Sequence, residues 1–409
     1  MAAPPVPTVL AQSSGDRTTA GVLERSRPEF DALCVPTDLW FEGGTGQNFL
    51  VCPSIVVGAG YTDNVFRTED DARGDLFTRI SPQVTLQSDW ANHALNLRAS
   101  GQLVRHSEEA RNDTEDVGLG ADGRLDIRED LFASAELGWS RASESRDEPE
   151  SPQGVSNVNT FYETSGEAAI NYRPTDFVFR LRTSAVRLDF QDNGPIENDD
   201  RDRMRYEVSG RAGYEYRETW TAFVEPSYRF TRYDQAVDSA GFERDSQGFD
   251  VSVGVQYDVT DLTFLEARVG YYRETFADQR FDAVSGISAG IDMTWNPTDL
   301  MTVTASGERG VEQTNQLDAS SLTRTELSLG LDYEILYDVL FTSGLHLRRD
   351  EFEGIDRTDD LIGGEIGLLY LMNEYATWRT SYQYTTLSST EDGESFDANT
   401  VFLSLRLQY

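Results

Sequence analysis

The 409-residue sequence lacks any long hydrophobic run. A membrane-spanning helix needs about 20 consecutive apolar residues, and the apolar stretches here are a handful of residues long. A membrane protein built from helices is therefore excluded. The mean hydropathy of −0.49 does not exclude a membrane, because a barrel wall needs an apolar residue only at every second position.

The sequence also has few cysteines, few histidines and little positive charge. Two cysteines are too few for a disulfide scaffold. The three histidines, His93, His106 and His346, have no Ser–His or Asp–His spacing typical of nucleophilic catalysis, so we expect no enzyme, no metal site and no cofactor. The formal charge of −36, from 71 acidic and 35 basic residues, argues against nucleic-acid binding, which requires a basic patch.

From about residue 50 onward, apolar and polar residues alternate with the period of a β-strand. In the last segment, one face carries Val401, Leu403, Leu405 and Leu407. The same alternation occurs at residues 131–139, 249–257, 287–295 and 326–335. Soluble β-sandwiches alternate as well, so this pattern alone leaves a large soluble sandwich or propeller open.

The connections between these segments are alternately tight and long. Tight turns are expected at 89–92, 128–130, 173–176, 217–219, 260–262, 296–299, 336–338 and 372–375. Longer, mostly acidic loops are expected at 68–75, 108–115, 144–152, 191–202, 234–246, 274–282, 310–318, 350–359 and 391–397. Short turns at one end and long loops at the other are typical of outer-membrane barrels.

These 17 connections predict an all-β fold, an antiparallel up-and-down transmembrane β-barrel of about 18 strands over residues 47–409. Its location would be the outer membrane of a Gram-negative bacterium, with both termini on the periplasmic side.

Residues 1–46 differ from the rest, because they lack strand alternation and are rich in proline, glycine and polar residues. We expect a flexible periplasmic tail, whose residues 1–11 resemble the end of a signal peptide that begins further upstream. In an oxidising compartment, Cys34 and Cys52 either bridge this tail to the first strand or stay free. A free-thiol assay on unreduced protein decides between the two.

Residues 49–106 carry a recognisable series of motifs. They include Tyr61-Thr62-Asp63-Asn64-Val65-Phe66-Arg67, then Asp75, Ile80-Ser81-Pro82 and Ser88-Asp89-Trp90. This region resembles the beta-barrel porins found in exopolysaccharide loci of proteobacteria. The resemblance implies an outer-membrane channel that works with periplasmic polysaccharide-export proteins. From the residues themselves, Asp63 and Asn64 favour a turn at the top of the first strand over a ligand site, because both tolerate left-handed backbone.

If the apolar faces meet lipid, the polar faces line the lumen. The candidate lining residues are Arg98, Arg180, Arg182, Arg205, Arg211, Arg229, Arg268, Arg324 and Arg406, with Glu207 and Glu215. Because the lining carries both arginines and glutamates, we expect these side chains mainly to form ion pairs with one another. An anion-selective pore would instead use rings of basic residues. A sharper hypothesis places Arg180, Arg182, Arg205 and Arg211 on neighbouring strands as a basic track for acidic sugars.

Four aromatic residues also fall on polar faces: Phe132, Phe223, Tyr272 and Phe402. They would either stack on passing sugars or pack against other parts of the interior, and packing is the simpler role.

Export of an exopolysaccharide or capsular polysaccharide is therefore the first functional expectation. The polymer would be the passenger, with outer-membrane lipid, lipopolysaccharide and periplasmic export proteins as partners. A general solute porin or uptake channel is the alternative. Such porins carry one long loop folded into the pore, and since no loop here exceeds about 15 residues, we expect the lumen to be closed in another way.

Overall fold

The computed structural model describes residues 34–37, 49–151, 157–194, 197–217, 219–259 and 262–409. The strands within them are β1 (Val35–Thr37), β2 (Phe49–Thr62), β3 (Asp75–Ser88), β4 (Ala94–His106), β5 (Thr114–Arg128), β6 (Leu131–Ser143), β7 (Thr160–Tyr172), β8 (Phe177–Phe190), β9 (Arg203–Glu215), β10 (Trp220–Tyr233), β11 (Ser246–Val259), β12 (Thr263–Phe276), β13 (Val284–Thr298), β14 (Met301–Glu312), β15 (Ser321–Leu336), β16 (Val339–Glu353), β17 (Thr358–Asn373), β18 (Ala376–Ser389) and β19 (Phe396–Gln408). Two 3₁₀ turns, η2 (Ala110–Asn112) and η3 (Asp199–Arg201), lie between strands. No helix in these ranges is long and apolar enough to cross a membrane.

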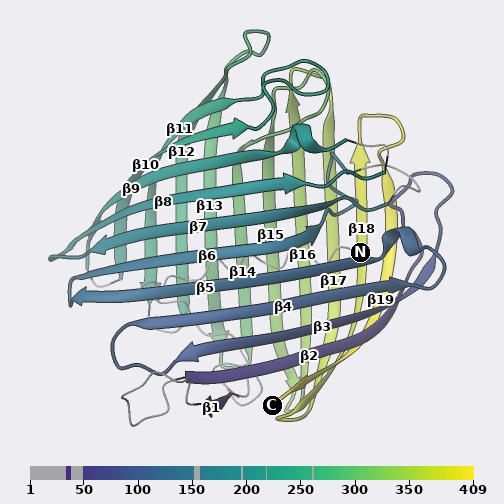
Figure 1. The fold of residues 1–409 in the computed structure, drawn as a ribbon. Coiled ribbons are helices and arrows are strands. Elements are labelled where there is room, and N and C mark those ends of the chain that lie inside the picture. The colour runs from purple at the N-terminus through teal and green to yellow at the C-terminus, as the bar shows by residue number, and fades with distance from the viewer. Residues whose placement is uncertain (1–33, 38–48, 152–156, 195–196, 218, 260–261) are drawn as a thin grey trace.

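Strands β2 to β19 form one closed antiparallel barrel (Figure 1). Each strand pairs with the next along the chain, and β19 pairs with β2 to close the ring, for example Leu403 with Ala59. Closure leaves no open edge, which is the condition for a sheet to span lipid. The predicted barrel of about 18 strands is confirmed.

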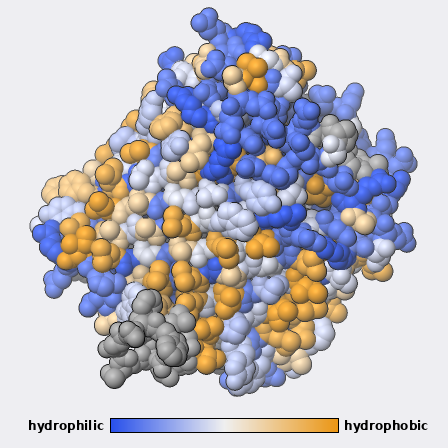
Figure 2. All heavy atoms as spheres, in the orientation of Figure 1, coloured by the Kyte–Doolittle hydropathy of each residue, from blue (hydrophilic) through white to orange (hydrophobic). Residues whose placement is uncertain are grey.

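Side chains on each strand point alternately outward and inward. On β19, Leu403 is 50% exposed, whereas Phe402 is 9% and Ser404 5% exposed. The outward positions carry large apolar residues around the wall, and Figure 2 shows these residues gathered below a hydrophilic upper end. The outer face is therefore the lipid-facing surface that the alternation predicts.

The short and long connections fall at opposite ends of the barrel, as the sequence predicts. Two residues suffice at 129–130, 299–300, 337–338 and 374–375, whereas the loop between β6 and β7 spans residues 144–159. Two loops are shorter than expected, because β12 continues to Phe276 and β16 to Glu353. In both places the strands remain paired with their neighbours beyond the predicted wall.

A short strand precedes the barrel. Strand β1 pairs antiparallel with the start of β2, Val35 opposite Val51, and a disulfide joins Cys34 to Cys52. It covers the part of β2 that extends past the end of β19, whose last paired residue lies opposite Ser54. Residues 34–37 of the expected tail are thus an ordered strand, and the remainder of residues 1–46 lies outside the described residues.

The barrel is flattened where β9 and β14 face each other. In Figure 1 the strands of the near wall, β2 to β10, run across the view, while β14 to β19 behind them run upward. Side chains of strands that are not neighbours meet across the interior of this flattened part. Arg205 on β9 lies 3.2 Å from Glu312 on β14.

Candidate functional site

The contacts between non-neighbouring strands identify the inward face. Arg211 on β9 donates hydrogen bonds of 2.9 and 2.8 Å to Glu266 on β12, and Arg229 on β10 donates one of 3.3 Å to the carbonyl of Val311 on β14. Such contacts can form only through the lumen. By register, all eleven candidate lining residues occupy inward positions of their strands.

Inside the flattened part of the barrel, arginines and carboxylates form a paired network. Arg211 also bonds to Glu225, and Arg182 lies 3.6 Å from Glu207 and 3.9 Å from Glu225. Arg268 lies 2.9 Å from Glu308. The interior charges largely satisfy one another at this level.

The four arginines of the hypothetical basic track do come together. Arg180 and Arg211 are direct partners on β8 and β9, but Arg182, Arg205 and Arg211 each bind a carboxylate. They therefore do not present a row of unneutralised positive charge. Three other candidates lie apart from them: Arg98 on β4, Arg406 on β19, and Glu215 at the short-turn end of β9.

The four inward aromatic residues are packed and covered. The Arg124 guanidinium lies 4.0 Å above the ring of Phe132, and that of Arg211 lies 3.9 Å above Phe223. Phe402 stacks on Phe77 with ring centroids 5.8 Å apart. The remaining residue, Tyr272, is 4% exposed. The rings offer no free stacking face, so they pack the interior.

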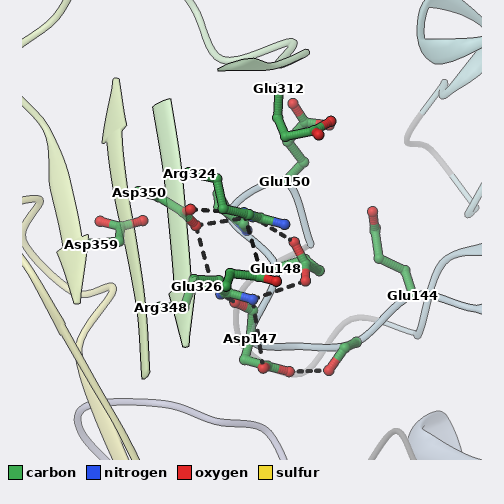
Figure 3. A network of polar contacts seen from close by, with 12 residues as sticks. Glu144, Asp147, Glu148, Glu150, Glu312, Arg324, Glu326, Arg348, Asp350 and Asp359 are labelled. Atoms are coloured by element: carbon green, nitrogen blue, oxygen red, sulfur yellow. Dashed lines mark hydrogen bonds and ion pairs between the residues drawn. The ribbon is translucent and has the colours of Figure 1, made fainter. Parts of the chain in front are cut away.

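The loop of residues 144–159, here called the crossing loop, leaves β6 and reaches the opposite wall (Figure 3). Of this loop, residues 144–151 and 157–159 are described. Its Glu148 carboxylate accepts hydrogen bonds from Arg324 on β15, at 3.1 Å, and from Arg348 on β16, at 2.9 Å. The sequence favours closing the lumen in a way other than a long inward loop, but here a loop of ordinary length reaches inward-facing arginines of the opposite wall. A short loop suffices because the flattened barrel brings β15 and β16 within its reach.

A buried carboxylate holds the two wall arginines from behind. Asp350 has a fully buried side chain and accepts hydrogen bonds of 2.8 and 2.9 Å from Nε and Nη2 of Arg324. Its other contact is an ion pair of 3.2 Å with Nε of Arg348. Arg348 also donates to the backbone carbonyl of Asp147 in the crossing loop. The anchor therefore includes main-chain as well as side-chain contacts.

A second anchor follows immediately along the crossing loop. Glu150 lies 3.1 Å from Arg201 of η3 and accepts a hydrogen bond from the amide of Asn315. Gln316 donates to the carbonyl of Pro149 at 2.8 Å. Burial opposes ionisation of Glu150, but the charges of Arg201 and Arg203 together with its hydrogen bonds lower the pKa of this carboxyl below its ordinary value. The crossing loop is thus held by charged contacts to two further loops.

The family-motif residues at the top of β2 lie beneath the crossing loop. Asn64 and Phe66 are each 2% exposed. The Asn64 amide donates to the carbonyls of Thr68 and Asp397, and Asp63 accepts two hydrogen bonds of 2.7 Å from Asn399. The guanidinium of Arg146, in the crossing loop, lies 5.2 Å above the Phe66 ring. This part of the motif therefore builds a platform for the loop.

The other motif residues are spread along the first hairpin. Tyr61 faces outward and is 48% exposed, and Trp90 packs against Phe49 at the turn between β3 and β4. Asp75 accepts hydrogen bonds from two loop amides, those of residues 108 and 109. Pro82 lies within β3. The motif forms no single ligand site.

The histidines show no catalytic arrangement within the described residues. His346 forms a hydrogen bond of 3.0 Å with Ser328 on the neighbouring strand, but no carboxylate of the described residues contacts its second ring nitrogen. His106 lies tilted against Phe77 with its Nδ1 3.4 Å from Asp113, but no nucleophile in the described part of the chain accompanies this pair, and His93 accepts a hydrogen bond from the amide of Asp126. No group of three or more His, Cys, Asp or Glu side chains in the described ranges is placed to hold a metal ion.

Sequence reasoning missed the acidic residues of the anchors, Asp147, Glu148, Glu150 and Asp350. The available signal is the run Glu144-Ser-Arg-Asp-Glu-Pro-Glu150, in which five charged side chains surround a proline in the longest loop. The partners of Asp147 and Glu148 lie 176 to 201 positions away, so the pattern alone does not identify them.

Comparison with known proteins assigns the family. The model of the family described as "Putative beta-barrel porin 2" matches residues 43–409, and the chain belongs to this family. It is an outer-membrane β-barrel of a Gram-negative bacterium. Among curated proteins, none matches the sequence.

The chain is similar to several solved porin structures. OpdO of Pseudomonas aeruginosa is 14% identical, with 88% of this chain and 97% of that chain covered and a TM-score of 0.46. A BenF-like porin of Pseudomonas fluorescens Pf-5 is 9% identical, with 88% and 99% covered and a TM-score of 0.46. OpdK of Pseudomonas aeruginosa, solved with vanillate, is 11% identical, with the same coverage and TM-score. These scores support no inference about what passes through this barrel.

Proposed function

We propose that this barrel is a passive channel for small polar solutes. The observation that carries the proposal is the crossing loop, which Glu148 and Glu150 fix to the opposite wall and to neighbouring loops. At 18 strands a barrel is too wide for wall side chains alone to fill, so an inward loop is an effective means of narrowing it. The paired charges around the passage suit hydrated polar solutes.

The same loop argues against free passage of a polymer. A polysaccharide must keep a continuous path open along the lumen for its whole length, whereas the crossing loop is held at both Arg324 and Arg348. Polysaccharide export, with periplasmic export proteins as partners, is therefore the second candidate. It requires those partners or the polymer itself to displace the loop. We propose no enzymatic role.

A liposome-swelling assay with solutes of increasing size tests this function. We expect purified protein to admit monosaccharides and small charged solutes and to exclude oligosaccharides of several units. A matched reference variant replaces residues 144–159 by Asn-Gly. Ser143 and Thr160 are direct partners across β6 and β7, so a two-residue turn can join them.

This short-loop variant should admit larger solutes than the natural protein. Entry of long oligosaccharides through the natural protein, at the same rate as through the variant, would favour export instead. Exclusion of every solute by both proteins would contradict a channel altogether.

A further inference from the structure

The wall arginines that bind Glu148 form an arrangement suited to a carboxylate ligand. Nη2 of Arg324 and Nη1 of Arg348 converge on the two oxygens of one carboxylate, at 3.1 and 2.9 Å. Guanidinium donors from two adjacent strands that meet on a single carboxylate give charge-assisted hydrogen bonds of defined geometry. Figure 3 shows the two side chains directed toward Glu148.

The two counter-ions of this arginine pair differ in their burial. Asp350 lies behind the arginines with a side chain that is 0% exposed, while the side chain of Glu148 is 35% exposed. Asp350 belongs to β16 itself, whereas Glu148 comes from a loop that enters from the opposite side. Asp350 is therefore the fixed positioning residue, and Glu148 is the partner that can be exchanged.

Two further carboxylates lie near the pair without hydrogen-bonding to the donors that Glu148 uses. Glu326 lies 3.8 Å from Nε of Arg324, and Asp147 lies 4.0 Å from Nη1 of Arg348. Both distances exceed hydrogen-bond range. When Glu148 leaves, Nη1 of Arg348 loses its hydrogen-bonded carboxylate. Nη2 of Arg324 keeps its bond to Asp350 but has its second N–H left for a ligand in the lumen, from which solvent already reaches Arg324.

We infer that Arg324 and Arg348 form a carboxylate-binding subsite for passing solutes, which Glu148 occupies as an internal ligand. A carboxylate solute competes with Glu148 for these donors, and its binding releases the first anchor of the crossing loop. The inference rests on the proposed function, since the ligand is a solute that travels through the lumen.

Calorimetric titration of the detergent-solubilised full chain with sodium acetate tests the subsite without requiring conduction. Glu148→Ala removes the internal ligand, and we expect its acetate Kd to be at least tenfold lower than that of the natural protein. Acetamide, uncharged and of similar shape, should show no such difference. Glu150→Ala is the matched control, because Glu150 lies in the same loop but binds Arg201.

A second variant keeps the inference falsifiable. Glu148→Ala combined with Arg348→Gln should lose the gain in acetate affinity, while the heat-dependent gel shift of a folded barrel shows that it is assembled. Equal acetate affinity in Glu148→Ala and in the natural protein would overturn the subsite, as would an equal gain in Glu150→Ala. Because swelling and titration are separate measurements, a failed channel and a failed subsite give different results.

Discussion

At the scale of single residues, Asp350 is the side chain on which the anchor of the crossing loop depends. It is fully buried between two arginines, so its removal leaves positive charges in a poorly solvated place. The contacts of Asp350 explain why these arginines point toward the loop.

Asp350→Asn should therefore lower the free energy of unfolding by about 3–5 kcal/mol, the usual cost of removing one partner of a buried ion pair. Reversible urea unfolding in lipid vesicles measures this change. Asp360→Asn is the control, because Asp360 pairs with Arg349 on the exposed outer face, 2.7 Å apart, and exposed pairs contribute little. A similar loss in both variants would contradict the role of Asp350.

Asp202, between η3 and β9, gives a prediction about pH. Burial raises the pKa of Asp202 to about 6, against the opposing hydrogen bond from the Phe190 amide. In the unfolded chain the same carboxyl titrates at about 4. The folded state thus binds this proton more tightly, and the stabilisation is present below about pH 4 and is lost as the pH rises through about 6.

Asp202→Asn removes this proton linkage. Relative to the natural protein, we expect the variant to gain stability as the pH rises from about 4 to about 6, with no further change above that range. Unfolding free energies measured at several pH values for both proteins give the difference. If the unfolding free energies of the two proteins changed in parallel between about pH 4 and about pH 6, the raised pKa of Asp202 would be refuted.

At the scale of elements, the crossing loop and β1 are the two parts that sequence reasoning placed least well. The wall strands were predictable, because each must alternate to keep one face in lipid, and segment 401–409 shows this directly. The crossing loop was not, because Glu148 meets partners 176 and 200 positions away. Strand β1 has three residues, too few for a periodic signal.

The disulfide gives a prediction for β1. With Cys34 and Cys52 bonded, unreduced protein should show no reactive thiol in a denaturing thiol assay. Replacing both cysteines by serine should release β1, since three paired residues hold poorly on their own. Hydrogen exchange at the amides of Val35 and Thr37 should then accelerate, while exchange within β2 beyond Ser54, where β19 covers the edge, stays unchanged.

Protection of Val35 and Thr37 that survives the double replacement would show that β1 is held by other contacts. Reactive thiols in the unreduced natural protein would contradict the disulfide itself.

At the scale of the whole molecule, the barrel is wide but flattened in part, and the crossing loop enters its interior at the end that carries the long loops. Arginine–carboxylate pairs that join β9 to β10, β12 and β14 line the narrow part, and the crossing loop reaches β15 and β16. The residues that face the lumen could be predicted from the sequence, because successive side chains of a strand alternate between the two faces of the wall. The pairing partners depend on the flattened shape, which no local pattern encodes.

Single-channel conductance in planar lipid bilayers tests the central claim most directly. The natural protein should form open channels of small, uniform conductance, and the short-loop variant, with residues 144–159 replaced by Asn-Gly, should conduct severalfold more in the same salt. Equal conductance of the two proteins would contradict the crossing loop as the constriction, and an absence of channels from both would contradict a passage through this barrel.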